Sequence, residues 1–168
     1  MTSVELVPAT YADVVFIARS LREDDYAEIM PLTWTRKPED LAVMSLADGG
    51  ISTVALSGGA PVSSYGAVEI RPKFWTVWMF ATDRWPEVAL KVTRAIKKDL
   101  IPDVYKRGWN RAECWSVEDH HTAHAWLEVL GAIRECSAED YGPNGKTYHC
   151  YSWTRSRFER QGGSFYVS

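Results

Sequence analysis

The segment 74–82, FWTVWMFAT, restricts the fold of this 168-residue chain more than any other stretch. Almost all of its residues are aromatic, β-branched or otherwise apolar, which favours a strand buried on both faces. Trp75 and Trp78 should point to opposite faces, because side chains alternate along a strand. The segment therefore predicts the central strand of a sheet that is covered on both sides.

The other elements are expected before and after this strand. Period-two patterns predict further strands at 4–7, 51–56, 62–70, 111–117, 133–139 and 147–153. Helical spacing predicts a helix from the N-cap Thr10 to Leu21, and helices at 37–46, 86–100 and 119–130. Pro102 should kink or split the third of these helices before Gly108. The order β-α-α-β-β-β-α-β-α-β-β predicts a mixed sheet with helices on both faces.

Composition is that of an ordinary globular domain. Apolar residues make up 46% and charged residues 24%, and the net charge is −3. The length suits one domain, which we place at 1–154, followed by a flexible, polar tail at 155–168. The N-terminus lacks the basic start and apolar run of a signal peptide, and no apolar run is long enough to cross a membrane. We therefore expect a protein that is neither secreted by a signal peptide nor inserted in a membrane.

The cysteines and histidines are the candidate metal ligands. Three cysteines lie far apart without a Cys-x-x-Cys pair, so we expect free thiols and no zinc site. In the stretch 119–132, DHHTAHAWLEVLGA, His120 and His124 share a helix face at the spacing of a two-histidine metal site. The alternative is a helix N-terminus, with Asp119 as N-cap and His120 and His121 in an exposed first turn. We favour this alternative and expect no metal.

A set of cations follows one face of the predicted helix at 86–100 and its continuation. This set could contact an anionic partner, but a solvated helix face is the simpler interpretation. The net charge of −3 argues against nucleic-acid binding. The set comprises Lys91, Arg94, Lys97, Lys98, Lys106 and Arg107.

The element order, the length and two short motifs resemble the GNAT superfamily of acyl-CoA N-acyltransferases over residues 4–154. The stretch 8–13, PATYAD, is similar to the A-T-x-x-D pattern after the first strand of that family. The stretch 120–132 is similar to its N-x-x-A-x-x-F-Y-x-K-x-G-F helix, with Ala123, Trp126 and Gly131 on the alanine, phenylalanine and glycine. The resemblance implies an α/β (α+β) fold with a mixed, mostly antiparallel sheet of about six or seven strands. It also implies acetyl-CoA as a ligand.

In GNAT proteins a [QR]-x-x-G-x-[GA] loop follows the central strand, and its glycines let backbone N–H groups approach the CoA pyrophosphate. This chain reads TDRWPE at 82–87, with no glycine, a proline that lacks an N–H, and two acidic residues. We therefore expect a weakened acetyl-CoA site. By the resemblance, its lining would comprise Phe80, Ala81, Thr82, Arg84, Trp85, Glu87, Val88, His120, Ala123 and Trp126.

The catalytic tyrosine of the family would be Leu127 here, which cannot donate a proton. His120 or His121 could replace it as the acid, because histidine titrates near neutrality. Glu69 and Glu113, on the strands beside the central one, are candidate bases for an amine. For Glu113 an exposed strand position without a catalytic role is the simpler interpretation.

Residues 50–135 are similar, more narrowly, to degenerate GNAT-like proteins of T7-like short-tailed bacteriophages, a family that includes an internal virion protein. The shared features are an aromatic central strand ending in Thr82-Asp83, a basic helix without a glycine loop, and the close WLEVLGA at 126–132. This resemblance implies a virion-associated or assembly protein that acts through protein–protein contacts, in the virion or the host cytoplasm. The alternative is an active N-acetyltransferase that moves acetyl from acetyl-CoA to an amine. A third possibility is an inhibitor of a host factor.

Overall fold

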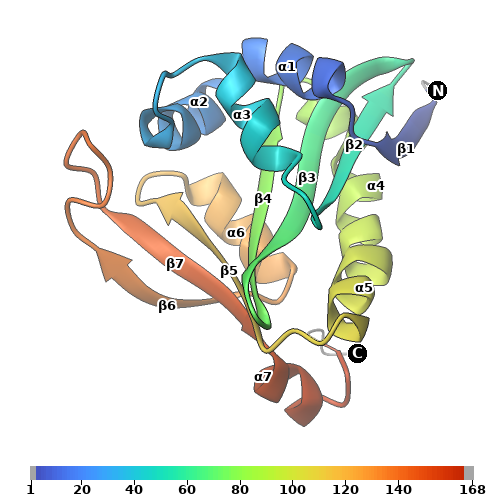
Figure 1. Ribbon diagram of the computed structural model, residues 1–168, viewed down its shortest axis with the longest axis vertical. Helices are drawn as coiled ribbons and strands as arrows, with labels where there is room; N and C mark the ends of the chain where they lie inside the picture. The colour runs from blue at the N-terminus through green and yellow to red at the C-terminus, as the bar shows by residue number, and fades with distance from the viewer. Residues whose placement is uncertain (1–2, 165–168) are drawn as a thin grey trace.

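The computed structural model describes residues 3–164, and these form a seven-stranded sheet (Figure 1). The strands lie in the order β1-β2-β3-β4-β5-β7-β6, and every neighbouring pair is antiparallel except β4 and β5. The segment predicted as central is β4, the fourth of the seven strands, so that prediction is confirmed. The strands are β1 (Val4–Pro8), β2 (Ile51–Ser57), β3 (Ala60–Arg71), β4 (Phe74–Ala81), β5 (Arg111–Val117), β6 (Ile133–Ala138) and β7 (Tyr148–Thr154).

Helices cover both faces of the sheet, as predicted (Figure 1). One layer of helices packs against the sheet face that carries Phe80. The helices and Phe80 form an apolar cluster there, and Trp78 packs against this cluster. The opposite layer packs around Trp75, so the two tryptophans do point to opposite faces. The first layer contains α1 (Tyr11–Arg19), α2 (Glu23–Ile29), η1 (Met30–Leu32) and α3 (Pro38–Ser45). The second contains α4 (Trp85–Ala95), η2 (Ile96–Leu100), α5 (Ile101–Lys106) and α6 (His121–Val129).

The long helix between β4 and β5 is divided close to Pro102, as the sequence predicted. The five-residue element η2 is a π-helical turn that ends directly before α5, and Pro102 lies in the first turn of α5. A proline removes one backbone donor and its ring clashes with the carbonyl four residues earlier. The wider π turn moves that carbonyl away from the ring, which lets the helix continue to Lys106.

β4 and β5 are paired only at one end, which opens a V in the middle of the sheet. Their parallel ladder joins Phe74 to Arg111 and ends where Thr76 meets Glu113. From there the two strands diverge toward their carboxyl ends, and each keeps its antiparallel neighbour on the other edge. The gap between them positions the candidate site.

Several local features differ from the sequence predictions. The helix α2 was not predicted, and Asp119 is not an N-cap. The cap position of α6 is His120, whose side chain is only 4% exposed, so its predicted place in an exposed first turn is also wrong. Asp119 instead forms an ion pair with Lys146 at 2.6 Å.

The segment that we predicted as a flexible tail begins with a helix, α7 (Arg155–Arg160). Phe158 of this helix is buried in the larger apolar cluster. Residues 165–168, at the end of the predicted tail, lie outside the described residues. Within residues 3–164 no helix is both long enough and apolar enough to span a membrane.

Candidate functional site

The open end of the V is capped by two carboxylates from α2. The Ala81 N–H, at the end of β4, donates to Asp25 Oδ2 at 2.7 Å. The Val117 N–H, at the end of β5, donates to Glu28 Oε2 at 3.1 Å. The two acids are three residues apart in α2 and therefore lie one above the other on one helix face. α2 thus ties together the carboxyl ends of two strands that no longer pair with each other.

His120 lies between these two carboxylates. Its Nδ1 is 2.8 Å from Glu28 Oε2, and its Nε2 is 3.7 Å from Asp25 Oδ1. Arg22 forms a second ion pair with Asp25, with Nε at 2.8 Å from Oδ2. The Ser116 hydroxyl also donates to Glu28, at 2.8 Å. Hydrogen bonds satisfy the Glu28 end of the cluster, whereas His120 Nε2 and Arg22 Nε are buried and face Asp25 by charge alone, without a hydrogen bond.

Burial and charge act in opposite directions on this cluster. Burial acts to lower the pKa of His120, but its hydrogen bond to Glu28 and the charges of Glu28 and Asp25 outweigh that effect and raise it. Burial raises the pKa of Asp25, and the partnership with Arg22 only partly compensates. The arrangement therefore favours a protonated His120 held between carboxylates.

The N-terminus of α4 is occupied by side chains of the protein itself. The Arg84 guanidinium donates to Glu87 from Nε at 2.9 Å and from Nη2 at 2.8 Å, and the Ser57 hydroxyl donates to Glu87 at 2.6 Å. These hydrogen bonds lower the pKa of Glu87 to about 2, so this carboxylate is ionised at any physiological pH. A negative charge fixed in the first turn of a helix takes the position that an anionic ligand would otherwise use.

The backbone of this turn is also bonded locally. Only residues 82–84 connect β4 to α4, which is shorter than a glycine-rich phosphate loop. The Trp85 N–H donates to the Thr82 carbonyl, and the Glu87 N–H donates to the Arg84 carbonyl, both at 3.0 Å. The Arg84 N–H donates to the Thr82 hydroxyl at 3.3 Å. With Pro86 lacking a donor, the turn presents few N–H groups to a phosphate.

A hollow of about 410 Å³ lies beside this turn, between α4 and α6. Its wall is built by Trp85 and Trp126, which meet edge to face with 5.5 Å between ring centroids. The Arg22 guanidinium lies over the Trp85 ring at 5.6 Å. The hollow is also lined by Met79, Pro86, Thr122 and Ala123, together with the acidic residues Asp24 and Asp83.

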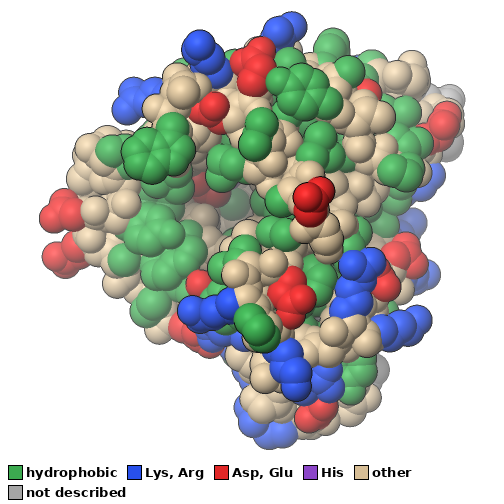
Figure 2. All heavy atoms as spheres, viewed as in Figure 1, with side chains coloured by type: hydrophobic (Ala, Val, Ile, Leu, Met, Phe, Trp, Pro, Cys, Tyr) green, Lys and Arg blue, Asp and Glu red, His purple; other side chains and the backbone are tan. Residues whose placement is uncertain are grey.

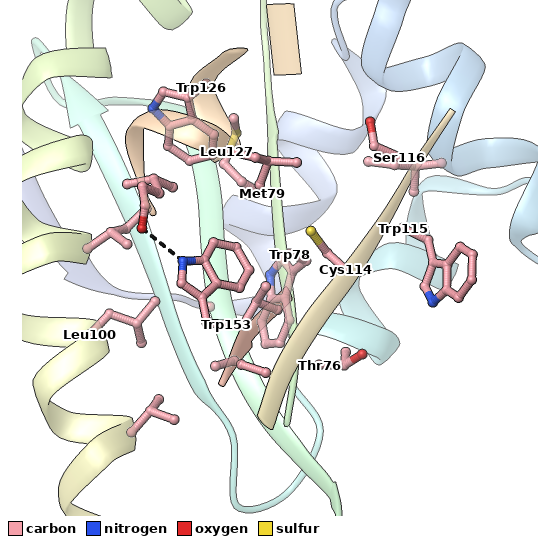
Figure 3. Close-up of a pocket in the computed structure, with 18 of the residues that line it drawn as sticks. Thr76, Trp78, Met79, Leu100, Cys114, Trp115, Ser116, Trp126, Leu127 and Trp153 are labelled. Carbon is pink, nitrogen blue, oxygen red and sulfur yellow. Dashed lines mark hydrogen bonds between the residues drawn. The ribbon is translucent and has the colours of Figure 1, made fainter. Parts of the chain in front are cut away.

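A second, apolar cavity of about 360 Å³ occupies the gap between β4 and β5 (Figure 3). Thr76, Trp78 and Met79 line it from β4, and Cys114, Trp115 and Ser116 line it from β5. Trp126 and Met79 line both this cavity and the hollow beside α4, so their side chains stand between the two spaces.

The three predicted catalytic residues do not converge. Glu69 is exposed and lies opposite Trp75, at the paired end of the V, where it accepts a hydrogen bond from the Lys73 N–H. Glu113 forms an ion pair with Arg111 at 2.7 Å, and only 16% of its side chain is exposed. His120 is closed in by α2. None of the three lines the hollow or the apolar cavity, whereas Leu127 lines the cavity.

The predicted acetyl-CoA residues fall into two groups. Trp85, Ala123 and Trp126 line the hollow beside α4. Arg84 and Glu87 form an ion pair with each other and line neither space. Phe80, Ala81, Thr82, Val88 and His120 are buried and line neither space.

The sequence prediction missed Arg22, Asp25 and Glu28, because a run of charged residues normally indicates a solvent-facing helix. Within residues 3–164, no group of three or more acidic, histidine or cysteine side chains could hold a metal ion.

No family model and no curated protein matches the chain. Solved structures do resemble it. The ribosomal-protein-S18-alanine N-acetyltransferase from Escherichia coli superposes with a TM-score of 0.66 at 14% identity, covering 92% of this chain and 94% of that one. An N-acetyltransferase from Staphylococcus aureus Mu50 gives 0.69 at 11% identity, covering 90% and 98%. An acetyltransferase of the GNAT family from Streptococcus pneumoniae gives 0.64 at 10% identity, covering 90% and 99%. At these identities the likeness concerns the fold alone: the chain has the fold of the GNAT acetyltransferases.

Proposed function

We propose that this protein uses the GNAT fold to bind protein partners and does not transfer acetyl groups. The observation that carries the proposal is the N-terminus of α4, where Arg84, Glu87 and Ser57 bind one another. In the family that the sequence resembles, this position holds the CoA pyrophosphate. Here an incoming pyrophosphate would meet the ionised Glu87 and a turn whose N–H groups are bonded locally.

Two further observations support a lack of acetyl transfer. The side chain at the position of the family's acid is the apolar Leu127, and His120 is 4% exposed and lines neither space. A general acid must come within hydrogen-bond reach of the leaving group. The edge-to-face pair of Trp85 and Trp126 also narrows the passage between the N-terminal turn of α4 and the gap between β4 and β5.

Calorimetry with acetyl-CoA tests this proposal. We expect no saturable heat up to millimolar ligand with the natural chain. Glu87→Arg should increase affinity for acetyl-CoA, because it exchanges a negative charge for a positive one at the helix N-terminus. Lys91→Ala, a change of charge further along the same helix, serves as the control. Saturable binding of acetyl-CoA to the natural chain would contradict the proposal.

We further propose that the protein works in a phage particle or in the host cytoplasm during phage assembly. The support is the sequence similarity of residues 50–135 to GNAT-like proteins of T7-like phages, together with the closed α4 turn. Mass spectrometry of gradient-purified particles should find this chain at a constant ratio to the portal protein. Its absence from both particles and assembly intermediates would contradict this role.

The second candidate is an N-acetyltransferase that uses acetyl-CoA and an amine acceptor. The open V between β4 and β5 favours it, because an extended ligand could pair with the strand edges there. Release of free CoA thiol from acetyl-CoA in the presence of an amine mixture is the decisive assay. Turnover that is abolished by Trp126→Arg and kept in Val129→Arg, a change on the outer face of α6, would establish this candidate.

A further inference from the structure

The last two strands of the sheet place two cysteines directly opposite each other. Among the described residues, the edge strand β6 pairs only with β7 (Figure 1). In this antiparallel ladder Cys136 is the partner of Cys150. Directly opposite residues point to the same face of a sheet, and their Cα atoms are about 4.5–5.5 Å apart. A disulfide bond spans Cα separations of about 4.4–6.8 Å, so this register suits one.

The ladder is irregular beside this pair. Its register shifts between Arg134 and Cys136, so β6 carries an extra residue there. Such a bulge leaves one residue unpaired and disrupts the ladder locally. A covalent bond between Cys136 and Cys150 would therefore hold β6 at the point where its backbone pairing is weakest.

The cysteine pair lies on the sheet face that points away from α6. Tyr151 and Trp153 are buried in the larger apolar cluster, and Cys150 points the other way because side chains alternate along a strand. Figure 1 shows no described helix in front of β6 and β7 on this face, and Figure 2 shows apolar and charged side chains at the surface there. A small reagent in solution can therefore reach this face.

The two thiols differ in access and in charge state. Cys136 is exposed, whereas Cys150 is 2% exposed. The Cys150 thiol donates to Glu113 Oε2 at 3.7 Å, and Arg111 Nη2 donates to Cys150 Sγ at the same distance. Burial, followed by the charge of Glu113, raises the pKa of Cys150 to about 12. Cys136 is therefore the thiol that meets a reagent first, and Cys150 reacts second, with Glu113 beside its proton.

We propose that Cys136 and Cys150 are a dithiol that a small disulfide, such as glutathione disulfide, closes into a cross-strand disulfide. First, Cys136 Sγ bonds to one sulfur of the reagent, and the other sulfur leaves as a thiolate that takes up the Cys136 proton. Cys150 Sγ then bonds to Cys136 Sγ and displaces the second thiolate, which receives the Cys150 proton by way of Glu113. Two protein thiols are oxidised and one reagent disulfide is reduced to two thiols.

The bond closes a loop of 15 residues, 136–150, counting both cysteines. Closing a loop of this length is expected to lower the equilibrium constant for unfolding about 100-fold. The edge of the sheet is thus locked in an oxidising medium and open in a reducing cytoplasm. This inference goes beyond the proposed function and does not depend on it, because neither acyl-CoA nor a protein partner takes part.

Peptide mapping tests the pairing, because trypsin places the three cysteines on separate peptides, 112–134, 135–146 and 147–154. The natural chain is equilibrated in glutathione buffers of rising oxidised fraction, and its remaining thiols are then alkylated. We expect the mass to fall by two hydrogen atoms and peptides 135–146 and 147–154 to be joined. A bond to peptide 112–134, a lasting glutathione adduct without a cross-link, or no oxidation at all would overturn the pair.

Three cysteine variants test the order of the steps, each after circular dichroism shows it folded. Cys150→Ser should stop after the first step and keep glutathione on Cys136, whereas Cys136→Ser should stay unmodified. Cys114→Ser is the matched control, because Cys114 lies opposite Tyr151 on the other face, and it should form the disulfide as the natural chain does. Loss of the cross-link in Cys114→Ser would overturn the pair. Glutathione on Cys150 in Cys136→Ser would overturn the order.

Glu113→Gln tests the route of the Cys150 proton. The amide cannot accept this proton, so conversion of the glutathione adduct into the disulfide should be at least tenfold slower. The first step, at Cys136, should keep its rate. Equal rates of conversion in the natural chain and the variant would overturn the role of Glu113.

Urea unfolding of the oxidised and the reduced chain tests the lock on β6. The equilibrium constant for unfolding should be about 100-fold smaller in the oxidised chain. Cys136→Ser, treated in the same buffers, should show no difference between the two conditions. An oxidised natural chain that is no more stable than the reduced one would overturn the lock.

Discussion

At the scale of single residues, His120 carries the clearest dependence on pH. Its pKa is raised in the folded chain, because Glu28 and Asp25 favour the imidazolium more strongly than burial disfavours it. A group whose pKa is raised on folding stabilises the protein below its unfolded pKa of 6.5. This stabilisation is lost as pH rises through the folded value. The pKa of Asp25 is also raised, so its contribution to stability likewise falls as pH rises, but in a lower pH range.

We predict that His120→Gln destabilises the fold most at mildly acidic pH. The amide cannot supply the positive charge that Glu28 and Asp25 face, so the variant should lose about 3 kcal/mol at pH 6. The difference from the natural chain should be smaller at pH 9, because the stabilisation by the natural imidazolium is lost as pH rises through its raised pKa. Urea unfolding followed by tryptophan fluorescence measures both values. His121→Gln, at an exposed position, is the control, and an equal difference at both pH values would contradict the interpretation.

Gly66 is a second residue with a specific steric role. A Cβ at this position of β3 would lie 2.0 Å from the Ile51 carbonyl oxygen and 2.5 Å from the Trp78 ring. We expect Gly66→Ala to cost about 3 kcal/mol of unfolding free energy, because the β2 backbone must move. Ser64→Ala, two residues earlier on the same strand, is the matched control. It removes a buried hydroxyl without a hydrogen-bond partner and should change stability little. Equal effects of the two substitutions would argue against the clash.

At the scale of elements, α2 explains why the site was hard to predict. Its sequence, EDDYAEI, has no apolar face, and its one buried residue is Asp25. Asp25 is buried because its partners are a strand end and a histidine that lie 56 and 95 residues further along the chain (81 − 25 and 120 − 25). Local patterns contain no information about such partners. The strands and α4 were predictable because their apolar periodicity is local.

The capping role of α2 can be measured by amide hydrogen exchange. In Asp25→Ala the Ala81 N–H loses its acceptor, and its exchange should accelerate by about 10- to 100-fold, which corresponds to about 1.4–3 kcal/mol. Asp24→Ala changes an exposed acid on the same helical turn and should leave Ala81 unaffected. If both substitutions accelerate exchange of the Ala81 N–H equally, α2 frays as a whole. The inference that Asp25 specifically caps the end of β4 would then be wrong.

At the scale of the whole molecule, the V makes the sheet depend on its covering elements. β4 and β5 share only three paired positions, so the two halves of the sheet are held together mainly by what packs across them. α2 does so at the open end through Asp25 and Glu28. The sequence predicted the strands and their order along the chain, because an apolar run such as 74–82 is stable only as a strand of a covered sheet. It did not predict the cavity, which exists because two distant strands diverge.

The closed end of the V is covered by α7, and this gives the last prediction. Phe158 is 8% exposed and lies 4.7 Å, between ring centroids, from Tyr105 of α5. The Arg155 side chain donates to the Trp109 carbonyl at 2.6 Å, which fixes α7 beside the start of β5. Phe158→Ala should cost about 3 kcal/mol, because it leaves a void in the cluster shared by α5 and the sheet.

Arg160→Ala, an exposed change in the same helix, should cost less than about 0.5 kcal/mol. Chemical unfolding followed by circular dichroism compares the two variants. If α7 is integral to the core, Phe158→Ala should shift the midpoint of one cooperative transition, since α7 and the sheet then unfold together. An early, separate transition would show that α7 unfolds independently. A midpoint equal to that of Arg160→Ala would show that it contributes little to holding the two halves of the sheet.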